Sequence, residues 1–310
     1  MIELRELTKL YGTVIGVNDI TISLEPGAYG LLGPNGAGKS TMLNLLTGQL
    51  SPTIGSVRVF GESPLNNAQL FNRIGYCPGS EGLYSNVSAF EWVSYLTELH
   101  GFSRAESHER ATVNLELVGL QSEAIHRPIS SYSRGMRQRT KLAQALAHDP
   151  ELLILDEPFS GLDPVGRYEM TEVLRDWIRL GRSLLLASHI LHEVEAITNS
   201  FLLICGGRLL ASGTAEEVNA LMEDVPNEFI VVCDAPRRLG ELVAGLAETD
   251  SVTYRGTDSV AVTTQSAGRL YSTLTKLSAE GTVTITGLTS TDESLQSLFN
   301  SLMSIHRGEL

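Results

Sequence analysis

Residues 33–41 read GPNGAGKST and fit the phosphate-loop pattern G-x-x-x-x-G-K-[ST]. A loop without bulky side chains can turn its backbone N–H groups inward around the α and β phosphates of a nucleotide. We expect Lys39 to reach the β and γ phosphates, and the Ser40 hydroxyl to face Mg²⁺. The following helix N-terminus adds favourable partial charge for an anion. The expected nucleotide-binding residues are Gly33, Pro34, Asn35, Gly36, Ala37, Gly38, Lys39, Ser40 and Thr41.

The flanks of this stretch predict a strand before it and a helix after it. Leu31 and Leu32 are typical of the end of a buried strand, and Gly48 is placed to end the helix. Between them lies an apolar set with helical spacing, made of Met42, Leu43, Leu45 and Leu46. The alternative is a chance glycine-rich turn, which this strand–loop–helix context disfavours. The sequence therefore predicts that the chain binds a nucleoside triphosphate.

Composition narrows the kind of protein. The 310 residues suffice for one large domain and a small one, and the net charge of −13 argues against a nucleic-acid partner. The three cysteines, Cys77, Cys205 and Cys233, are far apart, so we expect reduced, mostly buried thiols in a cytosolic protein. We find no signal-peptide pattern at residues 1–12 and no apolar run near the roughly 20 residues of a membrane helix. The chain is expected to be soluble, so any membrane role needs a partner.

The first two-thirds of the chain alternates strand-like and helix-like patterns, which predicts a parallel α/β core. From residue 88 to about residue 147 the pattern becomes mostly helical, which indicates a helical subdomain inserted in this core. The predicted strands are residues 20–24, 57–60, 152–155, 184–187 and 201–204.

A second, smaller domain is predicted at residues 227–310, after a nucleotide-binding domain at residues 1–222. The boundary is the charged, Pro-containing stretch 223–227, which follows a helix-like segment at 216–222. The second domain has the order β-α-β-β-α-β of a ferredoxin-like α+β fold. Its predicted strands are residues 229–232, 252–254, 260–263 and 283–286, and a last amphipathic helix carries Leu295, Leu298, Phe299 and Leu302.

Residues 152–158, LLILDEP, add a second half to the expected active site. Four apolar residues predict a buried strand, and Asp156 and Glu157 stand at its carboxyl end, where parallel sheets place ligand chemistry. Asp156 suits a contact to Mg²⁺, direct or through water. Glu157 is placed to polarise an attacking water as a general base. The alternative is a pair of solvated acids, which the upstream phosphate loop disfavours.

With these motifs in place, the chain resembles the ATP-binding cassette (ABC) family over nearly all of residues 1–222. Residues 132–139, YSRGMRQR, resemble the family signature usually written LSGGQ: Ser133 and Gly135 match, and Arg134 is a basic variant known among exporters. The resemblance implies that this segment contacts ATP on an opposite subunit. A Ser and a Gly at a helix start can offer a hydroxyl and an unhindered N–H to phosphate. Taken by itself, the octet fits a plain capped basic helix equally well.

Further motifs follow in the order typical of the family. Ser160 to Asp163 resemble the D-loop, which lines the dimer seam. Ser188 and His189 resemble the switch segment, whose histidine contacts the γ phosphate. Tyr11 resembles the aromatic residue that stacks on adenine. For Tyr11 the alternative is a half-buried tyrosine in an edge strand.

One position departs from the family pattern. Gly79 follows the segment 74–78, IGYCP, where the family usually has Gln, or Glu in some exporters. Glycine has no side chain to bind Mg²⁺ or to hold the water, so this contact is absent or is made by another residue, of which Glu81 is one candidate. The departure puts in doubt the coupling between nucleotide and membrane partner.

The resemblance implies an ATP-hydrolysing subunit of a membrane exporter, with ATP and Mg²⁺ as ligands. Its implied partners are an integral membrane permease and a second cassette, identical or not, at the cytoplasmic face of the membrane. The C-terminal segment 293–302 resembles single-cassette ATPases of exporters of drugs, lipids or polysaccharides, in which such a domain is thought to be regulatory. One alternative is a soluble regulatory cassette that acts on ribosomes or nucleic acid. Another is a pure binding module without catalysis.

Overall fold

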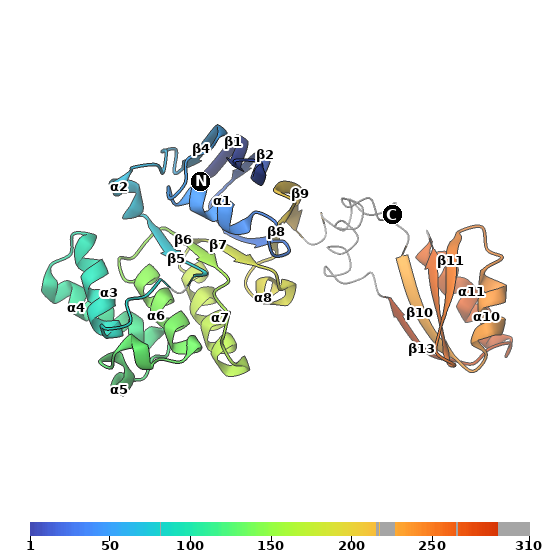
Figure 1. The fold of residues 1–310 in the computed structure, drawn as a ribbon. Helices are drawn as coiled ribbons and strands as arrows, with labels where there is room; N and C mark the ends of the chain where they lie inside the picture. The colour runs from blue at the N-terminus through green and yellow to red at the C-terminus, as the bar shows by residue number, and fades with distance from the viewer. Residues whose placement is uncertain (81, 215–216, 218–226, 265, 291–310) are drawn as a thin grey trace. The chain divides into compact units, whose positions relative to one another are not determined.

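The computed structural model describes residues 1–80, 82–214, 217, 227–264 and 266–290 (Figure 1). The chain divides into two compact units, Met1–Thr214 and Ala215–Leu310. Because residues 223–226 and the closing helix predicted around Leu295 lie outside the described residues, the predicted domain ranges stay predictions.

The first unit is built on a six-stranded sheet of order β5-β6-β7-β3-β8-β9, in which only the last pair is antiparallel. Every residue of β6 and β7 is buried, as expected for parallel strands covered on both faces. The strands are β5 (Ile74–Cys77), β6 (Leu152–Asp156), β7 (Ser183–Ser188), β3 (Ala28–Leu32), β8 (Ser200–Cys205) and β9 (Arg208–Thr214).

A second, antiparallel sheet of order β2-β1-β4 contains β2 (Val14–Leu24), β1 (Ile2–Tyr11) and β4 (Ile54–Val59). Helix α1 (Lys39–Leu46) packs against strands of both sheets (Figure 1). One apolar core joins all three layers. The buried side chains of α1 include the four predicted apolar residues, Met42, Leu43, Leu45 and Leu46. This packing fixes the phosphate loop between β3 and the first turn of α1.

Between β5 and β6 the chain is helical, as expected. Serine caps with reciprocal glutamate contacts start the first two helices of this region, Ser88 with Glu91 and Ser103 with Glu106. The elements are α3 (Ala89–Leu99), α4 (Arg104–Leu117), α5 (Ser122–Ile125), a 3₁₀ turn (Ile129–Ser131) and α6 (Arg134–Leu146). The other helices of this unit are α2 (Ala68–Phe71), α7 (Pro164–Arg179) and α8 (Leu191–Glu195).

The second unit has a four-stranded antiparallel sheet of order β11-β12-β10-β13 and a core of its own. The last predicted strand is displaced, since β13 begins at Ile285 rather than at residue 283. Its elements are β10 (Asn227–Cys233), α10 (Pro236–Val243), β11 (Thr249–Arg255), β12 (Ser259–Thr264), α11 (Ala267–Ala279) and β13 (Ile285–Ser290). The order β-α-β-β-α-β and this strand arrangement confirm the predicted ferredoxin-like fold.

The predicted fold class is thus confirmed: an α/β core with an inserted helical region, and a small α+β unit. The three cysteines are buried and form no disulfide. Within the described part of the chain, no helix has both the length and the apolar character required to cross a bilayer.

Candidate active site

The phosphate loop has a backbone that only glycine adopts readily. Gly36 and Gly38 have φ angles of +79° and +108°, and a Cβ on Gly38 would lie 2.3 Å from the carbonyl oxygen of Gly16. Lys39, 6% exposed, donates from Nζ to the carbonyl oxygens of Gly33 at 2.7 Å and Pro34 at 3.2 Å. Burial lowers the pKa of Lys39, while Glu157 and Asp156 oppose that shift.

The loop opens into a pocket of about 720 Å³ that gathers most of the predicted site. Residues that are far apart in the sequence of the first unit meet there, because α1 begins and the parallel strands end at the same edge of the sheet. The predicted residues that line the pocket are Tyr11, Pro34, Asn35, Gly36, Ala37, Gly38, Lys39, Ser40, Thr41, Arg134, Asp156, Glu157, Ser160 and His189. Those that do not line it are Gly33, Ser133, Gly135 and Asp163.

Asp156 ends β6 and lies against the first turn of α1. Its Oδ2 accepts a hydrogen bond from Ser40 Oγ at 2.8 Å, whereas its buried Oδ1 has no hydrogen-bond partner. Burial raises the pKa of Asp156, outweighing the opposing Ser40 hydrogen bond and lysine charges. A carboxylate oxygen without a partner beside a hydroxyl fits Mg²⁺, which typically takes one or two protein oxygens and completes its shell with phosphates and water.

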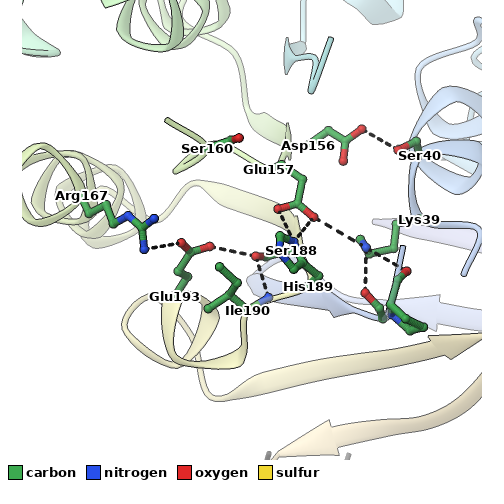
Figure 2. A network of polar contacts seen from close by, with 12 residues as sticks. Lys39, Ser40, Asp156, Glu157, Ser160, Arg167, Ser188, His189, Ile190 and Glu193 are labelled. Carbon is green, nitrogen blue, oxygen red and sulfur yellow. Dashed lines mark hydrogen bonds and ion pairs between the residues drawn. The ribbon is translucent and has the colours of Figure 1, made fainter. Parts of the chain in front are cut away.

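Glu157 lies between two nitrogen atoms in the same pocket (Figure 2). Its carboxylate oxygens are each 2.9 Å from Nδ1 of His189, and Oε1 is 3.7 Å from Nζ of Lys39. The backbone of Glu157 has φ +50°, a left-handed conformation unusual for a non-glycine residue, and its N–H donates to the carbonyl of Ala187. Strain of this kind often marks functional positions.

The signature-like segment begins a helix, as expected. Ser133 is the N-cap of α6 and its Oγ accepts from the N–H of Met136 at 3.2 Å. Arg134 donates to Ser160 Oγ at 2.6 Å, so the segment and the D-loop-like residues touch within one chain. Gly161 has φ +80°, and a Cβ there would lie 2.5 Å from the Arg134 side chain. Asp163 instead caps α7, accepting from the N–H of Gly166.

Two further predictions concern the pocket wall. Gly79 lies beside the proposed metal carboxylate, because a Cβ on it would be 3.2 Å from Oδ2 of Asp156. Lys141 stabilises the loop that contains Gly79, because its ammonium group donates hydrogen bonds to the carbonyls of Pro78 and Ser80. The candidate substitute Glu81 is outside the described residues.

Tyr11 ends β1, the central strand of its sheet, but at Tyr11 the register pairs β1 with β2 alone, because the β4 register ends at Thr8. The residue is 46% exposed, and its hydroxyl lies 3.4 Å from Oγ1 of Thr41. A Cβ on Gly16 would lie 2.8 Å from the ring, so glycine makes room for it. The tyrosine therefore presents an open aromatic surface at the pocket.

Sequence reasoning missed several polar residues of this region. Asn44 was recognisable, because it follows Ser40 by one helical turn on the same face of α1. Tyr76, whose hydroxyl donates to Asn44 Oδ1 at 3.3 Å, also lines the pocket, as do Gln49 and Ser80. A second missed group, built around Glu193, lies behind His189 and carries no recognisable motif.

The phosphate loop with its buried Lys39, the Ser40–Asp156 pair and the strained Glu157 define a phosphate-loop ATPase. Residues 17–160 match the family model described as "ABC transporter". The chain is 34% identical to the bacitracin transport ATP-binding protein BcrA of Enterococcus faecalis, over 98% of this chain and 96% of that protein. It is 36% identical to the Nod factor export ATP-binding protein I of Cupriavidus metallidurans, over 70% of this chain and 72% of that one.

Among solved structures, the fold is similar to the ATP-binding cassette MJ0796, determined as a dimer in a post-hydrolysis state with ADP and Pi. The TM-score is 0.65 at 21% identity, over 69% of this chain and 98% of that one. The chain described here therefore belongs to the ABC transporter family, as one of its ATP-binding, ATP-hydrolysing cassettes.

Proposed function

We propose that this ATPase powers a membrane exporter, and that the residues gathered in the pocket bind and cleave the ATP that drives it. The observation that carries the proposal is the convergence of Lys39, Ser40, Asp156, Glu157 and His189 at one edge of the parallel sheet. This set combines a cradle for phosphate, oxygen ligands for a cation and a carboxylate next to the cradle. A pure binding module needs only the first of these.

Binding begins with the phosphate loop and Lys39. In the structure the ammonium group is bound to the carbonyls of Gly33 and Pro34 and lies near Glu157. Phosphate oxygens would replace these contacts, and the N–H groups at the start of α1 would hold the α and β phosphates. The aromatic face of Tyr11 would stack on adenine.

Hydrolysis is assigned to Glu157, whose carboxylate would accept a proton from the attacking water. His189, at 2.9 Å from this carboxylate, would orient it and contact the γ phosphate. The fit of Ser40 and Asp156 to Mg²⁺ implies that the ion would neutralise charge that develops on the phosphates. Gly79 leaves the wall beside Asp156 without a side chain, so metal and water must be held by other groups.

We further propose that two cassettes enclose ATP between them, the pocket of one facing Ser133 and Gly135 of the other. Neither residue lines the pocket of its own chain, and both lie at the start of α6, where N–H groups and a hydroxyl can bind phosphate.

The transport role is supported by the relatives, which are named for bacitracin transport and for Nod factor export. These names favour an exporter over a cassette that acts on ribosomes or nucleic acid. We propose that the partner is an integral membrane permease, with this chain at its cytoplasmic face. The permease would select the cargo.

Purification of the tagged chain from membranes tests whether it has a membrane partner and hydrolyses ATP. We expect an integral membrane protein to co-purify and ATP hydrolysis to disappear in Lys39→Ala. Glu157→Gln should retain ATP binding while turnover nearly vanishes, and near-normal hydrolysis would remove Glu157 from the role of base. Glu169→Gln, which breaks an ion pair with Arg139, is the control for loss of a carboxylate.

A further inference from the structure

Behind His189 lies a buried carboxylate that the proposed chemistry does not use. Glu193, on α8, is 7% exposed, and a carboxylate at this depth is costly unless it is paired. It has two partners from different elements (Figure 2). Ser188 Oγ donates to Oε2 at 2.9 Å, and Nη1 of Arg167 on α7 is 3.2 Å from Oε1.

The first partner belongs to the turn that carries His189. Ser188 is fully buried, and its hydroxyl oxygen also accepts from the N–H of Ile190 at 3.1 Å. The residues immediately before and after His189 are therefore tied to one another and, through the same hydroxyl, to Glu193. Because a histidine ring rotates about few bonds, fixing its backbone on both sides limits where Nδ1 points, which is toward Glu157.

The second partner connects this turn to another part of the site. Nε of Arg167 donates to the carbonyl of Leu162 at 3.3 Å, within the D-loop-like segment 160–163. At the other end of that segment, Ser160 accepts from Arg134. Polar contacts therefore connect Arg134 to Ser160, and Leu162 through Arg167 and Glu193 to Ser188. The chain backbone completes the connection, from Ser160 to Leu162 within segment 160–163 and from Ser188 to the histidine beside the proposed base.

We propose that Glu193 and Arg167 are positioning residues for ATP hydrolysis: Glu193 holds the Ser188–Ile190 turn so that His189 meets Glu157, and Arg167 ties this turn to segment 160–163. The inference rests on the proposed roles of Glu157 and His189. Neither residue touches the pocket, so both act through the histidine. A purely structural ion pair would stabilise the fold without any preference for the chemical step.

Steady-state ATP hydrolysis by the full chain, together with ATP affinity and melting temperature, separates these roles. Glu193→Gln keeps the shape of the side chain and removes its charge. We expect kcat to fall about tenfold, because small misplacements of catalytic groups have large effects. ATP affinity should stay within about twofold, since no binding group is altered. Arg167→Met should give the same pattern.

The double variant tests whether the two residues act as one unit. Arg167→Met with Glu193→Gln should lose no more activity than the more severe single variant, because coupled residues are not additive. Ser188→Ala removes only the hydroxyl and is the substitute should the Glu193 variants not fold. Glu172→Gln is the matched control, because it breaks an ion pair with Arg175 on the same helix and takes no part in these polar contacts.

Three results would overturn the inference: an unchanged kcat in Glu193→Gln, losses that multiply in the double variant, or a kcat that falls only in step with the folded fraction. Failure of the proposed function is a different result. It would be seen as no ATP hydrolysis by the unaltered chain, or as full hydrolysis by Glu157→Gln.

Discussion

The Ser40 hydroxyl donates to Oδ2 of Asp156 at 2.8 Å, although 116 residues separate the two in the chain. The contact forms because α1 begins, and β6 ends, at the same edge of the parallel sheet. It satisfies one oxygen of a buried carboxylate and leaves the other without a partner. Burial raises the pKa of Asp156, which means that the folded protein without nucleotide disfavours the charge the site requires.

Asp156→Asn should therefore separate activity from stability. We expect ATP hydrolysis to fall by about a hundredfold or more, because a neutral amide is a poor Mg²⁺ ligand. Since the folded-state pKa of Asp156 is raised, the ionised group lowers stability as pH rises through that pKa, and a neutral side chain avoids this cost. The free energy of unfolding at pH 7 without nucleotide should stay equal or rise by up to about 1 kcal/mol.

Urea unfolding and an ATPase assay over a range of Mg²⁺ concentrations check both expectations. Glu151→Gln is the control, because it removes an exposed carboxylate paired with Arg73. A loss of stability in Asp156→Asn, with hydrolysis retained, would contradict the assignment of Asp156 as a metal ligand.

The left-handed backbone of Glu157 predicts an unusual order of stability among its variants. Glu157→Gly and Glu157→Ala both delete the carboxylate, so both should lose turnover. The glycine variant should nevertheless be more stable by about 1 kcal/mol, since alanine is strained at φ +50° and glycine is not.

The same pair of substitutions at Glu169, inside α7, gives the opposite expectation. There alanine should be more stable than glycine by about 1 kcal/mol, as in any helix interior. Chemical denaturation of the four variants decides the matter. Equal stability of the two Glu157 variants would mean that this residue carries no backbone strain.

Much of the site was predictable because its signals are local. The phosphate loop needs glycines and a lysine at fixed spacing. Asp156 and Glu157 follow a short unbroken apolar run, which is typical of a buried strand. The helical insertion was visible from its lack of β-branched runs. The second unit was predicted by its order of elements, although β13 begins two residues later than expected.

What the sequence could not give is the pairing of residues across elements. Arg167 on α7 and Glu193 on α8 each resemble an ordinary charged residue on the surface of a helix. Nothing in the local sequence shows that Glu193 is buried. The contact between Arg134 and Ser160 depends on how α6 packs, which no short pattern encodes. The central place of β1 in its sheet follows from strand pairing over more than 40 residues.

Tyr11 should contribute to binding of the base and not of the phosphates. We expect Tyr11→Ala to weaken ATP binding about tenfold, since base–aromatic stacking is worth about 1–3 kcal/mol. Tyr11→Phe should bind ATP within about twofold of the unaltered chain, because the ring is kept and the hydroxyl contact is long. Equilibrium binding of ATP and of inorganic triphosphate to the same variants provides the comparison.

Triphosphate lacks a base, so Tyr11→Ala should bind it as the unaltered chain does. An equal loss for ATP and triphosphate would instead show that the substitution disturbs the phosphate loop through Thr41. Tyr168→Ala, which removes another exposed tyrosine, on α7, is the control for surface truncation.

His148 predicts a dependence of stability on pH that is independent of the nucleotide site. Its ring is buried and stacks on His100 with ring centroids 3.9 Å apart, and its Nε2 lies 3.0 Å from the carbonyl of Ile74. Burial, with a smaller contribution from His100, lowers the pKa of His148 from 6.5 to about 4. The unfolded chain therefore takes up the proton more readily than the folded one.

Because the folded-state pKa is depressed, stability should be lost as pH falls from about 6.5 toward about 4. Between pH 7.5 and pH 5 we expect this group to cost about 2 kcal/mol of the free energy of unfolding. His148→Gln keeps a donor for the Ile74 carbonyl without a titrating group, so its stability should change less over that range. His192→Gln, at an exposed position, should follow the unaltered chain. Parallel urea curves for the unaltered chain and His148→Gln at both pH values would show that the buried imidazole is not the source of acid sensitivity.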